Sequence, residues 1–344
     1  QRHLTIPCEM CIRDRIWINA WNLANSTRQV DAPDGVTDFK TLWNNATWNT
    51  GANESKMQSD GQFSSVNRCS GIITENSDYF NTRQARFYVE NMPCAVTAQG
   101  KSLTAATYLT TNFGSAPYTA AEIEEAKAAI QTVGVHIGDI DCGPNVFAPI
   151  LSKKQRDHKV GWITGETSGH RIGGAQPHGG GYFSNEESDY EETWGLHIDG
   201  VDMKNYDGGT VFKTKGVKGL SWGVMYLDSI HAALSITLGT TGVGGDLFVR
   251  NQRQTTDTRP KGAGGTYCIN IVKSPGFILG GQVSVEQAAA QDAMKLISVE
   301  YSPGFKMPQG IRFKAARTTD VPIARIIGSD GCRIGLTDYE DTGG

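Results

Sequence analysis

The sequence has no long apolar stretch and no strong excess of one charge. No run of 18 apolar residues occurs in its 344 residues, so we expect no membrane insertion. The formal net charge is only −4, which argues against a nucleic-acid partner bound by counterion release. Phosphate-binding loops, the dinucleotide-binding fingerprint and zinc signatures are absent too. These absences remove several common classes of cofactor-dependent and nucleic-acid-binding protein.

Cysteine occurs seven times, an odd count that does not predict a complete disulfide framework. Cys8 and Cys11 form a single C-x-x-C pair without the further ligands that a zinc site needs. The surrounding letters CEMCIRDR resemble translated adapter sequence found in metagenome-derived reading frames. We therefore expect no metal at this pair, and no functional argument rests on residues 1–15.

Glycine, in contrast, is abundant, with 41 residues spread along the chain, as expected for many turns. In the stretch 194–252, glycines separate short runs in which apolar and polar residues alternate. Alternation with a period of two predicts strands with one buried face. Repetition of strand, bend and strand about every 20 residues is typical of a solenoid whose coils stack. The sequence therefore predicts a mainly β fold, namely a parallel β-helix with long loop insertions.

Four regions follow from this pattern. Residues 1–118 are predicted to be an N-terminal β-rich region, and residues 119–150 a capping helix with a first coil. Residues 151–193 combine a charge cluster, a Gly/His stretch and an acidic stretch, which predicts a loop insertion. Residues 194–344 are predicted to form the remaining coils, with a short helix near 285–297.

The clearest helix signal covers residues 120–133. Thr119 begins a capping box, and Gly134 fits the position just after the end of the helix. A helix at this place would cover the open end of the stacked coils, which otherwise exposes both core and strand edges. The second helix is predicted because Ser284 can cap it and Gln287 follows three residues later.

The letters DGVTD at 34–38 resemble the D-G-V-T-D-D-T segment near the start of pectate-lyase-like β-helices, which include phage tailspikes and related polysaccharide lyases and hydrolases. The match covers these residues only, because Phe39 stands where the second Asp is expected. The resemblance implies a right-handed parallel β-helix, an extracellular polysaccharide or cell-surface glycan as partner, cleavage by hydrolysis or β-elimination, and a homotrimer.

Acids and bases alternate on the outward face of the predicted coils. Stacked coils place outward residues about 4.8 Å apart, so that acids can reach the roughly 5–9 Å separation used in glycoside hydrolysis. A lyase would instead pair a Lys, Arg or His base with acids. The alternative interpretation is a solvated strand face. The predicted catalytic residues are Asp199, Asp202, Asp228, His231 and Lys204.

Aromatic and cationic side chains near these acids suit sugar stacking, although core filling is an alternative for each aromatic residue. The predicted substrate-binding residues are Trp194, Tyr190, Tyr226, Arg250 and His197. The acidic stretch that contains Glu187 and Asp189 is a candidate Ca²⁺ site, with a solubilising loop as the alternative. No other cofactor is expected.

One close match to a catalytic motif does not indicate a catalytic site. The letters GLSWG at 219–223 fit the G-x-S-x-G elbow of α/β-hydrolases. In that fold the Ser leads into a helix, whereas a strand-like run follows Ser221 here. The later His231 also lies too close in sequence for that fold. We therefore interpret the match as chance in a glycine-rich chain.

Three functions remain. The first is an extracellular polysaccharide-binding and polysaccharide-degrading β-helix protein, either a lyase or a glycoside hydrolase. The second is a non-catalytic receptor-binding tail fibre or adhesin. The third is a structural or shell protein of a virion. All three predict an extracellular or virion-associated location.

Overall fold

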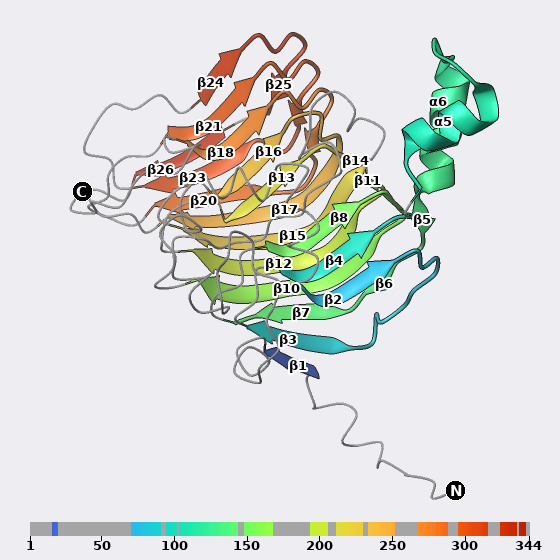
Figure 1. The fold of residues 1–344 in the computed structure, drawn as a ribbon. Coiled ribbons are helices and arrows are strands. Elements are labelled where there is room, and N and C mark those ends of the chain that lie inside the picture. The colour runs from blue at the N-terminus through green and yellow to red at the C-terminus, as the bar shows by residue number, and fades with distance from the viewer. Residues whose placement is uncertain are drawn as a thin grey trace, which may run out of the picture.

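The computed structural model describes residues 16–19, 70–90, 94–101, 103–143, 148–167, 193–205, 211–229, 233–251, 267–287, 295–315, 324–335 and 337–341. This part of the chain is mainly β, as predicted, and contains two helices (Figure 1). All strand pairings found within it are parallel.

The strands form one large sheet and three smaller ones. The 14-stranded sheet contains β1 (Ile16–Asn19), β3 (Arg86–Glu90), β6 (His136–Ile137), β7 (Asp139–Cys142), β10 (Lys159–Thr167), β12 (His197–Asn205), β15 (Leu220–Ser229), β17 (Gly242–Asn251), β19 (Ile278–Leu279), β20 (Val283–Gln287), β22 (Lys306–Met307), β23 (Ile311–Ala315), β25 (Arg333–Ile334) and β26 (Thr337–Asp341). The five-stranded sheet contains β13 (Phe212–Lys215), β16 (Leu234–Thr237), β18 (Tyr267–Val272), β21 (Lys295–Glu300) and β24 (Ala324–Ile327). The four-stranded sheet contains β5 (Thr132–Val133), β9 (Gln155–Arg156), β11 (Thr193–Trp194) and β14 (Val217–Lys218), and the three-stranded sheet contains β2 (Ser70–Glu75), β4 (Cys94–Gln99) and β8 (Ala148–Lys153).

The chain returns to the same sheet again and again, each time one strand further along. His197 of β12 pairs with Ser221 of β15, which pairs with Val243 of β17. In the five-stranded sheet, Leu234 of β16 pairs in the same way with Ile269 of β18. The colours of Figure 1 accordingly run in chain order across the large sheet from β3 to β26. This order of large parallel sheets is compatible with a parallel β-helix.

The core lies inside the sheets, because inward side chains of successive strands fall into line. One such line is almost fully buried and consists of Ile163, Val201, Met225, Leu247, Val283 and Ile311. Burial of one side chain of this size contributes about 1.5–3 kcal/mol. Trp222 also faces inward, with ring centroids 6.1 Å from Phe212 and 5.8 Å from Phe277. Core filling, the alternative noted above for aromatic residues, therefore applies to Trp222.

The predicted loop insertion at 151–193 is wrong for its first part. Residues 151–167 belong to β8, β9 and β10, whereas residues 168–192 lie outside the described part of the chain. The charged residues led to a wrong prediction because some of them occupy corners between strands. Two of these corner residues, Lys154 and Asp157, have positive φ angles of 55° and 53°. Corners of this kind require the left-handed region, which short polar side chains such as Asp tolerate better than bulky ones.

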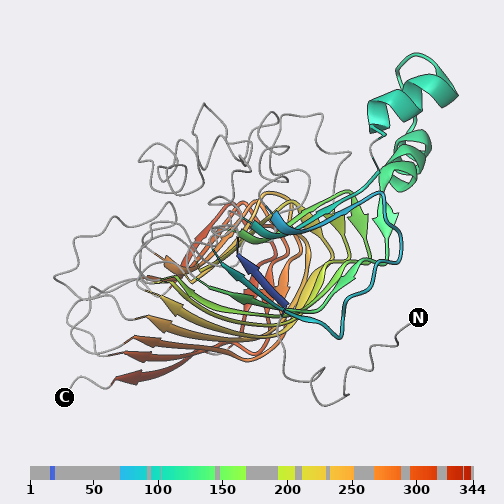
Figure 2. The same ribbon diagram turned by 60° about the horizontal axis from the view of Figure 1, so that its bottom comes forward.

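The predicted helix at 120–133 is confirmed as α6 (Ala120–Ile130), with the capping box of Thr119 and Glu122 in place. It ends earlier than predicted, because Gln131 is already extended with ψ of 149°. A second helix that the sequence did not predict, α5 (Ala105–Phe113), packs against it. In Figures 1 and 2 this pair stands beside the sheets, which differs from the expected position across their end. Within the described residues, neither helix is long and apolar enough to cross a membrane.

The predicted helix near 285–297 is wrong at both of its ends. Val283–Gln287 forms β20 and Lys295–Glu300 forms β21, while residues 288–294 lie outside the described part. Ser284 pairs with Phe248 in the large sheet and caps no helix there. The spacing of Ser284 and Gln287 that suggests a capping box occurs here within an alternating strand whose residues Val283, Val285 and Gln287 are buried.

Candidate functional site

The outward face of the large sheet carries most of the predicted site residues. On β12, Ile198, Val201 and Met203 are buried in the core, as the alternation predicts. Asp202 and Lys204 are exposed, and Asp199 is partly exposed, on the opposite face. The neighbouring strands β10, β15 and β17 extend this face on both sides.

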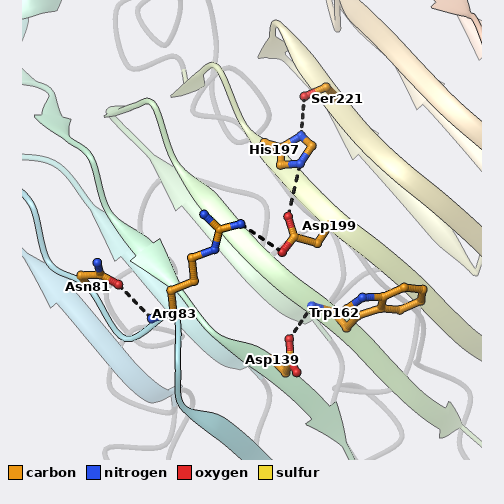
Figure 3. A network of polar contacts seen from close by, with 7 residues as sticks. All are labelled: Asn81, Arg83, Asp139, Trp162, His197, Asp199 and Ser221. Atoms are coloured by element: carbon orange, nitrogen blue, oxygen red, sulfur yellow. Dashed lines mark hydrogen bonds and ion pairs between the residues drawn. The ribbon is translucent and has the colours of Figure 1, made fainter.

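A chain of polar contacts crosses one end of this face (Figure 3). The Ser221 Oγ atom lies 2.9 Å from His197 Nδ1, and His197 Nε2 lies 3.3 Å from Asp199 Oδ1. The other oxygen of Asp199 is 3.6 Å from a guanidinium nitrogen of Arg83. The Arg83 backbone N–H donates to the Asn81 side-chain oxygen at 2.9 Å, which positions the segment before β3. An imidazole between a hydroxyl and a carboxylate can transfer a proton to or from a bound molecule.

Ser221 lies within β15 and not at a turn between strand and helix. The rejection of the α/β-hydrolase elbow is therefore confirmed. Sequence reasoning missed Arg83, because this residue precedes β3 and reaches Asp199 from a distant part of the chain.

Asp139 and Trp162 form the neighbouring part of this surface. The Trp162 backbone N–H donates to Asp139 Oδ1 at 2.9 Å, and Arg86 lies 3.8 Å from the other oxygen. The Trp162 ring lies over Gly200, where a Cβ atom would come within 2.7 Å of the ring. Glycine at this position lets the aromatic ring lie flat on the sheet.

A second set of outward residues lies further along the same strands, and we call it the aromatic row. It consists of the register neighbours Asp141, Thr164, Asp202, Tyr226 and Phe248. The rings of Tyr226 and Phe248 are stacked, with centroids 5.2 Å apart and an angle of 12° between the planes. Tyr226 remains 44% exposed. No hydrogen bond or ion pair reaches the Asp202 carboxylate from any described residue.

A third set, the charge row, lies beside the aromatic row. Its register neighbours alternate in sign: Lys204, Asp228, Arg250, Glu286 and Lys314. Opposite charges that face each other across neighbouring strands stabilise a sheet by roughly 0.2–1 kcal/mol per pair. The row therefore gives Lys204, Asp228 and Arg250 a structural role that needs no catalysis.

Of the remaining predicted residues, Trp194 is described and lies away from this face. Trp194 lies on β11 in the four-stranded sheet, where the Arg156 guanidinium sits 5.9 Å from the centre of its ring. His231, Tyr190, Glu187 and Asp189 lie outside the described residues. Within the described ranges, no group of three or more His, Cys, Asp or Glu side chains is arranged to hold a metal ion.

One buried histidine lies apart from the outward face. The His158 Nδ1 atom is 3.0 Å from the Ser152 hydroxyl, which accepts a hydrogen bond of 3.2 Å from Thr193. Burial lowers the pKa of His158 to about 3, and the nearby His136 adds to the effect. The imidazole is therefore neutral over the physiological range and belongs to the core.

Searches of protein-family models, of curated proteins and of solved structures found no match to this chain. The fold and the outward face alone therefore define its class. It is a mainly β protein of parallel sheets, and one face of its large sheet presents stacked aromatic rings, a carboxylate and a polar network.

Proposed function

We propose that this chain is an extracellular polysaccharide-binding protein that holds a glycan on the outward face of the large sheet. The aromatic row carries the proposal. Flat aromatic rings bind the C–H faces of sugars, and polar groups beside them fix the orientation. Tyr226 and Phe248 supply a stacked and partly exposed surface, and Asp202 is the next residue in the row. An extended polymer fits a row that crosses successive strands.

The proposal includes the finer description of the fold as a right-handed parallel β-helix of the pectate-lyase-like type. The parallel pairing of each strand with the strand from the next return of the chain supports it. The DGVTD segment at 34–38 lies outside the described residues. As in other proteins of that type, we propose a homotrimer at an extracellular or virion-associated location.

Cleavage of the bound polymer is the second part of the proposal. Asp199 and Asp202 lie three residues apart on β12. At about 3.3 Å per strand residue, their backbones are roughly 10 Å apart. This is close to the carboxyl separation of glycosidases that use a water between two acids. The contact of His197 with both Asp199 and Ser221 supplies a group that can carry the proton.

The experiment measures binding and product formation together. The protein is incubated with a panel of capsular and algal polysaccharides, and binding is followed by affinity electrophoresis. Products are followed by the ultraviolet absorbance of unsaturated uronates and by new reducing ends. We expect binding that Tyr226→Ala weakens, and new reducing ends that Asp199→Asn and Asp202→Asn abolish.

Each contrary result points to another function. Retained binding without any product would favour a non-catalytic receptor-binding fibre or adhesin. Large closed assemblies in light scattering, in place of a trimer, would favour a virion shell protein. Failure to bind any glycan in the panel would refute the proposed function.

A further inference from the structure

We infer that the aromatic row selects a polysaccharide with free, positively charged amino groups, such as a polymer of deacetylated hexosamine. The inference rests on the proposed function and names its ligand class. It follows from how charge is distributed around Tyr226 and Phe248, in three steps.

The first step concerns the aromatic surface itself. The two rings are almost parallel and belong to adjacent strands. Because the rings stack face to face, Phe248 covers one face of Tyr226, and the 44% exposed Tyr226 turns its other face toward β12 and Asp202. The face of an aromatic ring also attracts a cation within about 6 Å of its centre, so an ammonium group on a stacked sugar is favoured there.

The second step concerns Asp202, which follows Tyr226 in the row. Its carboxylate is exposed and has no partner among the described residues. The Thr164 hydroxyl on its other side donates to Asp141 Oδ1 at 3.1 Å, so this contact serves Asp141 and not Asp202. Because neighbouring strands are about 4.8 Å apart, a group stacked on Tyr226 lies within reach of this carboxylate. The negative charge of Asp202, which no described residue neutralises, complements an ammonium group.

The third step concerns the cations that a uronate polymer would require. In the charge row, Arg250 lies between Asp228 and Glu286 in register, Lys204 lies beside Asp228, and Lys314 lies beside Glu286. Arg312 is an exposed cation in the same register line as Phe248, two strands beyond it on β23, and it faces Asp338 on β26. A carboxylated sugar stacked on Tyr226 would therefore face Asp202, whereas Arg312 lies three strands away on β23. Like charges of this kind reject the wrong ligand.

The test compares three polymers by isothermal titration calorimetry at constant, near-physiological salt: chitosan oligosaccharides with free amino groups, the same oligosaccharides after N-acetylation, and oligogalacturonate. We expect the free-amine form to bind about tenfold tighter than the acetylated form, and oligogalacturonate not to bind. A factor of ten corresponds to about 1.4 kcal/mol, a reasonable value for one partly exposed charge pair with a cation–π contact.

Variants assign the effect to its residues. Asp202→Asn should remove the preference for the free amine and leave binding of the acetylated form unchanged. Tyr226→Ala should weaken both. Asp330→Asn is the matched control, because Asp330 is an exposed acid of the turn before β25, outside the register line of Tyr226, and should not affect binding.

The outcomes separate the two proposals. Equal binding of free-amine and acetylated polymers, or tighter binding of oligogalacturonate, would refute the inference while the proposed function stands. An amine preference that survives Asp202→Asn would also refute it. Absence of binding to all three polymers and to the wider panel would refute the proposed function as well.

Discussion

Two acids that look alike in the sequence have different surroundings in the structure. Asp202 lies beside exposed aromatic rings without a partner among the described residues, whereas Asp228 lies between Lys204 and Arg250 in register. Sequence alternation predicts that both face outward, because that depends only on the period of a strand. Sequence alternation cannot distinguish the two acids, because the residues next to each acid lie on other strands and are set by the strand register.

Reversing the charge of Asp228 should therefore affect stability. In Asp228→Lys, the new cation faces a cation on each side, and we expect the free energy of unfolding to fall by roughly 0.5–2 kcal/mol for two disrupted pairs. Urea unfolding followed by circular dichroism measures it. The control Asp202→Lys should change the free energy by less than about 0.5 kcal/mol, since no described pair is lost. Equal losses in the two variants would contradict the assignment of the charge row.

His158 predicts a loss of stability in mild acid. In the folded protein its pKa is lowered to about 3 by burial, whereas the unfolded chain takes up the proton near the ordinary value of 6.5. Stability is therefore greatest above pH 6.5 and decreases as the pH falls toward 3, by up to about 1.4 kcal/mol per pH unit. The pKa of His136 is lowered as well, mainly by burial, so it acts in the same direction.

The measurement is the free energy of urea unfolding between pH 7 and pH 5, above the range in which most carboxylates titrate. We expect a decrease of roughly 1–2 kcal/mol over this interval. His158→Asn should reduce the slope, and the part that remains is assigned to His136, whose pKa is also lowered by burial. A wild-type slope of zero would show that His158 titrates normally.

At the scale of elements, a glycine inside a strand marks a close contact with a ring. A Cβ atom at Gly244 would lie 2.1 Å from the ring of Trp222, which packs between Phe212 and Phe277. We expect Gly244→Ala to lower the free energy of unfolding by about 1–3 kcal/mol, the range for overpacked cores. Val243→Ala changes the adjacent residue, whose side chain is 50% exposed, and should have little effect. Equal stability of the two variants would mean that the ring can move aside.

A repeat in the sequence indicates part of this architecture. Ser-Pro-Gly-Phe occurs at 274–277 and again at 302–305, and Ser-Asp-Gly-Cys follows at 329–332. The structure aligns these segments: the Ser274 backbone N–H donates to Ser302 Oγ, and the Ser302 N–H donates to Ser329 Oγ, both at 3.0 Å. Identical turns at regular intervals indicate stacked units. The same repeat would have argued against the helix predicted near 285–297.

At the scale of the whole molecule, the class of fold was predictable and the pairing of its strands was not. Alternating runs indicate strands wherever one face is buried, and the described residues of the alternating stretch 194–252 do form strands, such as β12 and β15. Which residues pair depends on how many residues separate successive returns of the chain to the same sheet, and this number varies. His197 meets Ser221, but Val243 meets Ile278, much further along the sequence. Arg83 and Phe248 were missed for this reason, since only the register places them beside Asp199 and Tyr226.

Among the described residues, the pair of helices α5 and α6 has a hydrophobic core of its own. We therefore expect that the pair can be removed while the sheets stay folded. Leu109, Ala126 and Ile130 pack within α5 and α6 and not into the main core. The two ends of the pair already meet, because the Lys101 N–H donates to the Ile130 carbonyl at 2.8 Å. A variant with residues 103–129 replaced by a short Gly-Ser linker, and with Ile130→Ser, should therefore keep the parallel sheets.

We expect this variant to lose the helical signal in circular dichroism, to keep a cooperative unfolding transition, and to bind glycan as the full chain does. The reason is that the aromatic row belongs to the large sheet, which the two helices flank in Figures 1 and 2 without forming part of it. The full chain with Ile130→Ser alone is the control for the point substitution. Loss of cooperative unfolding only on excision would show that the pair stabilises the sheets, in the manner of the cap that the sequence predicts.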